Sequence, residues 1–195
     1  MKKVAVIGSG SWGTALSTLL ASTSDEVIIW SREADVAESI NKEHVNCRHL
    51  SDSELPHNIV STTSEAEALT GVDAVVMAAP SAFLRSVCAA CAPYLDPEVD
   101  VLILSKGMEA GSHKLMHEVA ADELGNPARI AVLSGPNHAE EVIKQGISAA
   151  VVASEDAEVA KRFQTLLSRS YFRTYVSSDV RGVEACAAAK NVVAI

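Results

Sequence analysis

The chain has 195 residues, of which 48% are hydrophobic, 21% charged and 4% aromatic, which is enough apolar content for a well-buried core. Its apolar blocks are shorter than the ~18 residues that a membrane helix needs, which excludes a membrane-spanning protein. The net charge is −9 with no compensating run of Lys and Arg, which excludes a general nucleic-acid binder. An anionic ligand would therefore be bound by local groups.

Short β-type blocks alternate with amphipathic helical stretches, a pattern typical of an α/β fold with a doubly wound, mostly parallel sheet covered by helices on both faces. We predict strands over residues 3–7, 26–30, 58–61, 73–78, 100–104, 129–133, 149–153 and 172–176. Apolar residues at helical spacing predict a helix between the first two strands. They also predict helices over residues 33–43, 64–69, 82–92, 112–123 and 157–167.

A glycine-rich segment stands directly after the first predicted strand and opens the first predicted helix. It has the pattern Gly-x-Gly-x-x-Gly, with glycines at Gly8, Gly10 and Gly13 and with Ser11 and Trp12 between the last two. In a Rossmann-like unit such glycines allow a tight turn, close approach of a pyrophosphate and close helix packing. The helix N-terminus then attracts the phosphates. We predict a dinucleotide site here, the alternative being a merely tight turn.

The end of the second predicted strand bears on the choice of cofactor. The acidic residue that usually binds the ribose of NAD is absent after Trp30, where Ser31 and Arg32 stand. Arg32 could pair with a 2′-phosphate, which favours NADP, while Glu33 could serve NAD instead. A third possibility is that Arg32 is a solvated surface charge. The expected cofactor is therefore NADP or NAD.

Cysteine usage favours a reducing cytoplasm. The chain has few cysteines for its length and no disulfide framework: Cys47, Cys88, Cys91 and Cys186. Cys88 and Cys91 form a Cys-x-x-Cys pair, but both fall on the apolar stripe of a predicted helix, where cysteine acts as a small hydrophobe. His44, Cys47 and His49 match no zinc signature and suggest a polar surface loop. We predict no metal site.

Polar residues follow three further predicted strands, at the sheet edge where ligands bind. They are Ser81 and the segments 105–107 and 134–137. Lys106 could hold a negative oxygen or a phosphate there, and Gly107 beside it leaves space for the ligand. The alternative is an ordinary surface lysine.

A last helix is predicted from Asp179, a good N-cap residue, to Ile195. Because it ends on an apolar run without a stop signal, we expect the chain to be cut within this helix. Lys190 lies one turn after the small residues Cys186 and Ala187, which would leave a recess below its ammonium group. A partly desolvated lysine can act as an acid or base. The alternative is a lysine that extends its charge into water.

The sequence resembles one dehydrogenase family over nearly its whole length. The resemblance is carried, in order, by VAVIGSGSWGTAL, INKEHVNCRHLSDSELPHNI, LSKGME, SGPNHAEEV and VEACAAAKNVVAI. These segments are similar in order and spacing to NAD(P)-dependent glycerol-3-phosphate dehydrogenase, and to its bacterial form in particular. The resemblance implies reduction of dihydroxyacetone phosphate to sn-glycerol 3-phosphate for phospholipid synthesis. It implies a cytoplasmic enzyme, and we expect a homodimer with no nucleic-acid partner.

The resemblance also implies roles for single residues. Cofactor binding would fall on Gly8, Gly10, Ser11, Trp12, Gly13, Arg32, Lys106 and Ala139. Substrate binding would fall on Lys106, Gly135, Asn137, Lys190 and Asn191. Lys190 would be the catalytic acid or base that supplies a proton to the developing alkoxide, and Lys106 would stabilise the charge.

This chain departs from the family pattern in three places. Asn137 and His138 stand where Ser or Thr followed by Phe or His is common, and His49 stands where Tyr is frequent. The family continues into a helical domain that supplies an Asp partner for the catalytic lysine and an Arg-Asn pair for the substrate phosphate, and those positions are absent here. We therefore expect residues 1–178 to form the cofactor domain and 179–195 to begin the helical one. Such a chain would bind cofactor with little or no turnover.

Two other functions fit the glycine-rich loop. One is a stand-alone dinucleotide-binding or sensor module without chemistry. The other is a related dehydrogenase acting on hydroxy acids or hydroxyacyl thioesters, against which the Lys-Gly and Lys-Asn elements argue.

Overall fold

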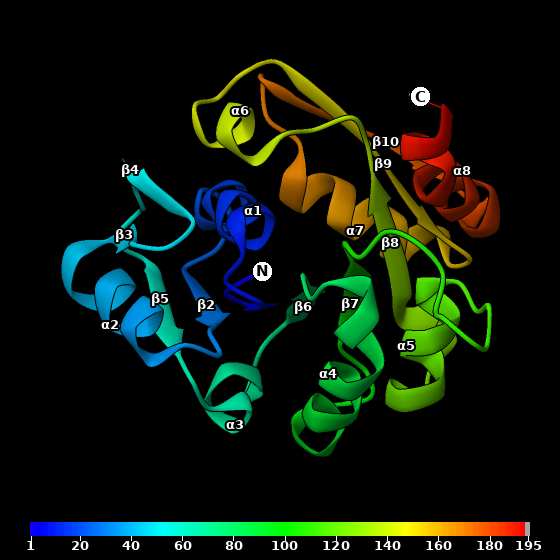
Figure 1. Ribbon diagram of the computed structural model, residues 1–195, viewed down its shortest axis with the longest axis horizontal. Helices are drawn as coiled ribbons and strands as arrows, with labels where there is room; N and C mark the ends of the chain where they lie inside the picture. The colour runs from blue at the N-terminus through cyan, green and yellow to red at the C-terminus, as the bar shows by residue number, and fades with distance from the viewer. Residues whose placement is uncertain (194–195) are drawn as a thin grey trace.

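A computed structural model describes residues 1–193, with side chains described as far as Lys190. Its centre is a sheet in the spatial order β10-β9-β8-β7-β6-β1-β2-β5 (Figure 1). These strands are β1 (Lys3–Ile7), β2 (Glu26–Trp30), β5 (Ile59–Thr62), β6 (Ala74–Met77), β7 (Asp100–Ile103), β8 (Ile130–Ser134), β9 (Ser148–Ser154) and β10 (Phe172–Ser177). All eight correspond to predicted strands, and their ends differ from the prediction by at most one residue.

The sheet is parallel except at one pair, which confirms the predicted Rossmann-like, mostly parallel architecture. The exception is β9, which runs antiparallel to β8. Between these strands the chain forms only the short helix α6 (Ala139–Ile143), which the sequence analysis did not predict. An antiparallel neighbour starts at the edge where the preceding strand ends, so no crossover helix is needed.

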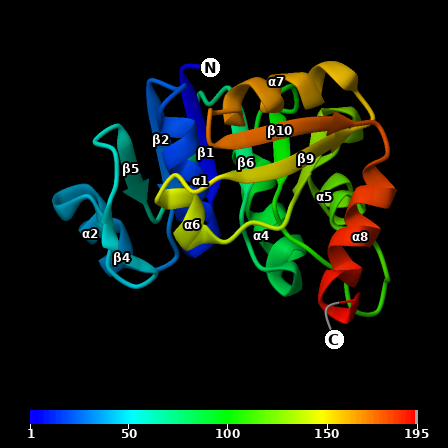
Figure 2. The ribbon, with the colours of Figure 1, turned by 90° about the horizontal axis from the view of Figure 1, so that it is seen from above.

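Helices cover both faces of the sheet (Figure 2). One face carries α1 (Ser11–Ala21), α2 (Ala34–Glu43), α6 and α7 (Ala157–Leu167). The other carries α3 (Glu65–Leu69), α4 (Leu84–Cys91), α5 (Met116–Leu124) and the start of α8 (Val180–Val193). Single 3₁₀ turns cover Ser81–Phe83, Ala92–Tyr94 and Pro127–Arg129. In the part of the chain that the structure describes, no helix is long and apolar enough to cross a membrane.

Two predicted boundaries and one predicted loop need correction. The helix expected over 112–123 begins only at Met116. The helix expected over 82–92 begins as a 3₁₀ turn and becomes α4 at Leu84. The segment read as a polar loop around Cys47 is a small antiparallel hairpin of β3 (Val45–Asn46) and β4 (Leu50–Glu54). Because β4 is largely exposed and polar, it lacks the apolar alternation that predicts a strand.

The core has two apolar layers because alternate residues of each strand point to opposite faces. In β1, Val4 and Val6 pack in the layer under α1 and α7, whereas Ala5 and Ile7 pack in the layer under α3, α4 and α5. Strand β1 is central, so its side chains from Val4 to Ile7 are fully buried, alternately on the two faces. This burial holds fixed the end of β1 from which the glycine-rich loop begins.

Cys88 and Cys91 lie fully buried in the second layer. The prediction that this Cys-x-x-Cys pair belongs to the apolar stripe of a helix is therefore confirmed. Burial raises the pKa of both thiols to about 12. Cys47 and Cys186 are exposed.

A thiol reagent at about pH 8 should therefore label Cys47 and Cys186 in the native protein and spare Cys88 and Cys91, because the thiolate is the reactive form. Mass spectrometry of the labelled peptides measures the four sites separately. Labelling in urea, where all four should react, is the control. Labelling of Cys88 in the native protein as fast as Cys47 would contradict the buried placement.

Arg169 ties the C-terminal ends of two helices together. Its guanidinium donates hydrogen bonds to the Leu19 carbonyl of α1 and, at 2.8 Å, to the Leu166 carbonyl of α7. It also donates to Ser22 Oγ at 2.6 Å and to Thr23 Oγ1 at 2.9 Å. The side chain is half-buried, and this burial lowers the pKa of Arg169. One cation thus contacts carbonyls in the last turns of two helices, at the negative ends of their dipoles.

We expect Arg169→Ala to lower the free energy of unfolding by about 2 kcal/mol, the usual range for hydrogen bonds from a charged donor. Urea denaturation followed by circular dichroism measures the loss. Arg173→Ala, which removes the same charge from an exposed site on β10, is the matched control and should cost less than about 0.5 kcal/mol. Equal losses in the two variants would refute the capping role.

Candidate functional site

The three glycines of the loop each meet a different steric demand. Gly8 has φ +122°, a conformation that favours glycine. A Cβ at Gly13 would lie 2.2 Å from the Gly8 carbonyl oxygen, so only glycine lets α1 approach the turn. A Cβ at Gly10 would meet nothing within 4 Å, which leaves open space in front of the loop. These contacts match the predicted turn, close packing and room for a ligand.

The N-terminus of α1 opens onto this space. Gly10 is its N-cap and offers no side chain to the first turn, in which there is no acidic residue. The first intrahelical bond runs from the Thr14 N–H to the Gly10 carbonyl at 2.9 Å. The N–H groups of the first turn of α1, before Thr14, therefore have no acceptor within the helix. They lie at the positive end of the helix dipole. Such a terminus binds phosphate groups.

The end of β2 lies against the same loop. The Gly8 N–H donates to the Trp30 carbonyl at 3.1 Å, and Arg32 stands two residues further on. The Arg32 side chain is 77% exposed and pairs with Glu33 at 2.9 Å. Arg32, which could favour NADP, and Glu33, which could serve NAD, therefore form an ion pair. This pair lies at the place expected for the adenosine ribose.

A second set of predicted residues meets at the ends of β7 and β8. Lys106 Nζ donates to the Gly135 carbonyl at 3.0 Å. The Lys106 side chain is half-buried, and burial, followed by the nearby charge of Lys190, lowers the pKa of Lys106. Gly107 has φ +125°, a conformation that favours glycine, and it lies beside Ser81. The lysine is thus aimed along the carboxyl edge of the sheet rather than freely into solvent.

Asn137 carries an unsatisfied buried amide. Neither its side-chain oxygen nor its nitrogen has a hydrogen-bond partner among the described residues, and both atoms are buried. A Cβ at Gly135 would lie 2.6 Å from Asn137 Nδ2 and from the Ala149 carbonyl oxygen, so glycine is required there as well. Ala139 begins α6, which packs against α1. These residues lie at the edge of the sheet that also carries the glycine-rich loop.

Helix α8 brings Lys190 toward Lys106. Its first turn is capped by Asp179, whose Oδ1 accepts the Gly182 N–H at 2.8 Å, which confirms the predicted N-cap. Glu184 is buried and anchors α8 to α5 by accepting from the His117 N–H at 3.0 Å and pairing with His117 Nδ1. Figure 2 shows α8 beside α5 at one side of the sheet.

The predicted recess below Lys190 needs correction. Lys190 is exposed, and so is Cys186 one turn before it, so this chain does not bury the ammonium group. On α8, Val180 and Glu184 are buried, whereas Cys186 is exposed. Asn191 lies within α8, but its side chain is outside the described residues.

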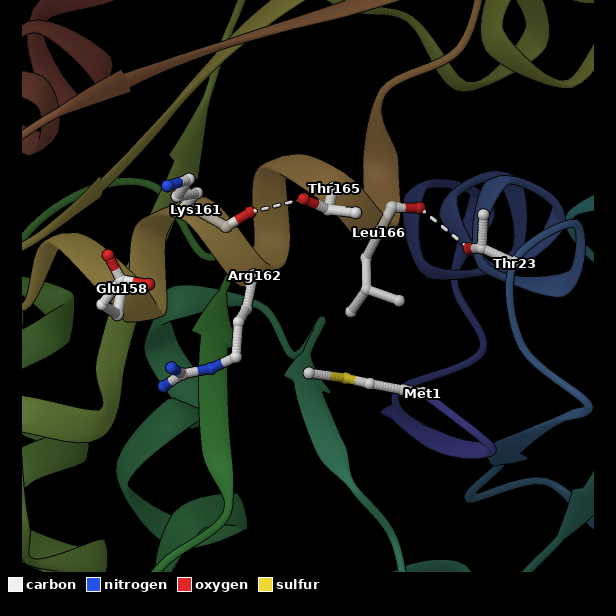
Figure 3. A pocket seen from close by; sticks show the side chains of 7 residues that line it. All are labelled: Met1, Thr23, Glu158, Lys161, Arg162, Thr165 and Leu166. Carbon is white, nitrogen blue, oxygen red and sulfur yellow. Dashed lines mark hydrogen bonds between the residues drawn. The ribbon is translucent and has the colours of Figure 1, made fainter.

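A hollow of about 550 Å³ lies away from these residues (Figure 3). It is lined by Met1, Thr23, Glu158, Lys161, Arg162, Thr165 and Leu166. Met1 precedes β1, so this hollow lies at the amino ends of the strands, opposite the glycine-rich loop. Ligands of open parallel sheets bind at the carboxyl ends. Within residues 1–193, no three His, Cys, Asp or Glu side chains gather as a metal site requires.

Sequence analysis missed one residue of the site, Asn46. Its buried amide reaches the glycine-rich loop and donates to the Ser9 carbonyl at 2.7 Å. Asn46 stands in one of the segments that carry the family resemblance, but neither periodicity nor spacing gives this single Asn a role. The contact spans 37 positions of sequence, so only folding brings the two together.

Comparison with known proteins places this arrangement in a family. The family model described as NAD-dependent glycerol-3-phosphate dehydrogenase N-terminus matches residues 3–160. The chain belongs to this family. It is 46% identical to glycerol-3-phosphate dehydrogenase (NAD(P)+) of Streptomyces griseus over 99% of this chain, and 43% identical to that of Enterococcus faecalis over 100%.

A solved structure agrees with this assignment. The crystal structure of glycerol-3-phosphate dehydrogenase from Coxiella burnetii superposes with a TM-score of 0.91 at 34% identity, over 99% of this chain and 59% of that one. The chain spans 58% of the length of the two curated relatives.

The lowered pKa of Lys106 predicts a pH-dependent stability difference between wild type and Lys106→Met. The folded protein binds the lysine proton less tightly than the unfolded chain, whose lysine keeps its usual pKa of 10.5. The cost of burying the charge is therefore complete below the folded-state pKa and vanishes above 10.5. Wild type should gain stability relative to the variant as pH rises from about 7 to about 11.

Urea denaturation across that pH range measures the difference. Lys144→Met is the control. Lys144 is exposed at the C-terminal end of α6, so this variant should show no comparable change. A constant difference between wild type and Lys106→Met over the whole range would contradict the desolvated environment of Lys106.

Proposed function

We propose that the chain is the cofactor-binding part of a glycerol-3-phosphate dehydrogenase. The whole enzyme would transfer hydride between NAD(P)H and dihydroxyacetone phosphate to form sn-glycerol 3-phosphate. The observation that carries the proposal is the open N-terminus of α1, which shares the carboxyl edge of the sheet with the Lys106 and Gly135 pair. The names of the Streptomyces and Enterococcus relatives support the same activity.

The cofactor would lie along the glycine-rich loop. Its pyrophosphate would accept from the N–H groups of the first turn of α1, including Ser11, Trp12 and Gly13, while Gly8 allows the turn and Gly10 leaves room for the ligand. Arg32 would contact the adenosine ribose, and Lys106 and Ala139 would contact the nicotinamide half. NAD(P)H supplies the hydride when bound. The unsatisfied loop amides fit an anionic group in a protein whose net charge is −9.

The substrate would lie between the lysines. Lys106 would hold the developing negative oxygen with its ammonium group, and Gly135 would leave space beside it. The buried amide of Asn137, which has no partner within the described residues, would find one in a substrate hydroxyl or phosphate. Lys190 would donate the proton to the alkoxide, with Asn191 beside it.

The remaining inferences concern the whole enzyme. We infer that residues 1–178 are its cofactor domain and that residues 179–195 begin its helical substrate domain. We also propose a cytoplasmic homodimer that serves phospholipid synthesis.

Cofactor binding is tested with Gly10→Ala and Gly13→Ala. The methyl group at Gly10 would enter open space, so stability should hardly change, but it would occupy the predicted pyrophosphate site and raise the Kd for NADPH at least tenfold, about 1.4 kcal/mol. The methyl group at Gly13 would meet the Gly8 carbonyl oxygen and should lower the free energy of unfolding by about 2 kcal/mol or more. Isothermal titration calorimetry and urea denaturation measure the two effects.

The wild-type chain is the reference for both variants. Failure of wild type to bind either NADPH or NADH would overturn the proposed function. Unchanged NADPH affinity in Gly10→Ala would show that the cofactor lies elsewhere.

The pairing of Arg32 with Glu33 allows a test of which cofactor is preferred. If Arg32 binds a 2′-phosphate, Arg32→Ala should weaken NADPH binding about tenfold or more, in the range for a charge-assisted hydrogen bond, and leave NADH binding unchanged. Glu33→Gln should then strengthen NADPH binding, because it releases Arg32. A loss of NADH affinity in Glu33→Gln would instead assign the ribose contact to Glu33. Titration of both cofactors against the three proteins decides between NADP and NAD.

A further inference from the structure

We propose that Asn46 is a positioning residue for the dinucleotide loop. Its amide fixes the orientation of the peptide between Ser9 and Gly10 and so directs the Gly10 N–H toward the pyrophosphate. This inference rests on the proposed binding of a dinucleotide at the loop. It assigns a role to the β3–β4 hairpin, which the proposed function leaves without one.

Asn46 uses its full hydrogen-bonding capacity while being completely buried. Its Nδ2 donates to the Ser9 carbonyl at 2.7 Å and to Thr14 Oγ1 at 2.8 Å. Its Oδ1 accepts the N–H groups of Arg48 at 3.3 Å and His49 at 3.2 Å. One side chain therefore shapes the hairpin turn and holds the loop at the same time.

The Ser9 carbonyl is held from two sides. Besides the Asn46 amide, Thr14 Oγ1 donates to it at 3.2 Å from the first turn of α1. The peptide between Ser9 and Gly10 is trans, as are all the described peptides. In a planar trans peptide the C=O and N–H groups point in opposite directions. With the carbonyl bound inward, the Gly10 N–H must point outward.

The outward direction is the one that a ligand could use. A Cβ at Gly10 would meet no atom within 4 Å, so the space there is open. In residues 1–193 the structure gives the Gly10 N–H no acceptor. A donor that is fixed in direction and unpaired binds an anion without a cost for ordering the peptide.

The loop needs such a restraint because of its composition. Glycine adopts many backbone conformations, and the peptide before Gly10 lies only two residues after Gly8. Without Asn46, Thr14 would be the remaining side chain that holds the Ser9 carbonyl. The peptide could then rotate, and ordering it would reduce the affinity for the cofactor.

Asn46→Ala and Asn58→Ala are a matched pair for the test. Asn58 Nδ2 also donates to two carbonyls, Ala21 at 2.8 Å and Ser24 at 3.1 Å, but at the far end of α1. Both variants lose an amide of the same kind without a change in charge. The Kd for NADPH is measured by calorimetry well below the unfolding midpoints of all proteins, and those midpoints are measured separately.

We expect Asn46→Ala to raise the Kd for NADPH at least tenfold and Asn58→Ala to change it less than twofold, although both lower the unfolding midpoint. A folded Asn46→Ala with wild-type affinity would overturn the inference and leave the proposed function intact. Equal losses of affinity in both variants would also overturn it, because they would reflect stability alone.

Thr14→Val keeps the test decisive if Asn46→Ala does not fold. It preserves the shape of a buried side chain but removes the second donor to Ser9. Thr14 Oγ1 also accepts from Asn46 Nδ2 at 2.8 Å, so the variant loosens the Asn46 amide as well. We therefore expect a three- to fivefold rise in the Kd for NADPH, and an unchanged Kd would overturn the inference. If wild type itself binds neither NADPH nor NADH, the proposed function fails, and this inference fails with it.

Discussion

The close approach of α1 to the turn after β1 is the constraint on which the site depends. A Cβ at Gly13 would overlap the Gly8 carbonyl and also contact Ala78, so helix, turn and the end of β6 share one tight junction. This junction places the N-terminus of α1 at the carboxyl edge of a strand whose own side chains are buried on both faces. The turn is closely packed on the side of α1 and β6, where a side chain at Gly13 would find no room.

Helix α1 is then restrained along its length by residues distant in sequence. Asn46 and Thr14 hold its first turn to the loop, while Arg169 and Thr23 join its last turn to α7. Its dipole therefore keeps a fixed direction relative to the sheet, and its N-terminus stays open. Fixed donors that need no reordering on binding are how an acidic protein can bind an anion locally.

The part of the site at the ends of β7 and β8 depends on charged groups, and burial lowers the pKa of one of them, Lys106. Lys106 gives up part of its hydration to reach the Gly135 carbonyl, and the charge of Lys190 adds to that cost. Two cations near one another are unfavourable in an empty site and become favourable when an anion lies between them. Asn137 is a neutral group in the same part of the site, and its buried amide has no hydrogen-bond partner among the described residues.

Local patterns were enough to predict the eight strands, the glycine-rich turn and the cap at Asp179, because each rests on periodicity or on a backbone conformation that few residues adopt. The antiparallel course of β9, the β3–β4 hairpin and the contacts of Asn46 could not be predicted in this way, since they arise between distant segments. Burial also separated residues that look alike in sequence. Lys106 is half-buried and Lys190 exposed, because fractional exposure depends on what packs against a helix or strand end.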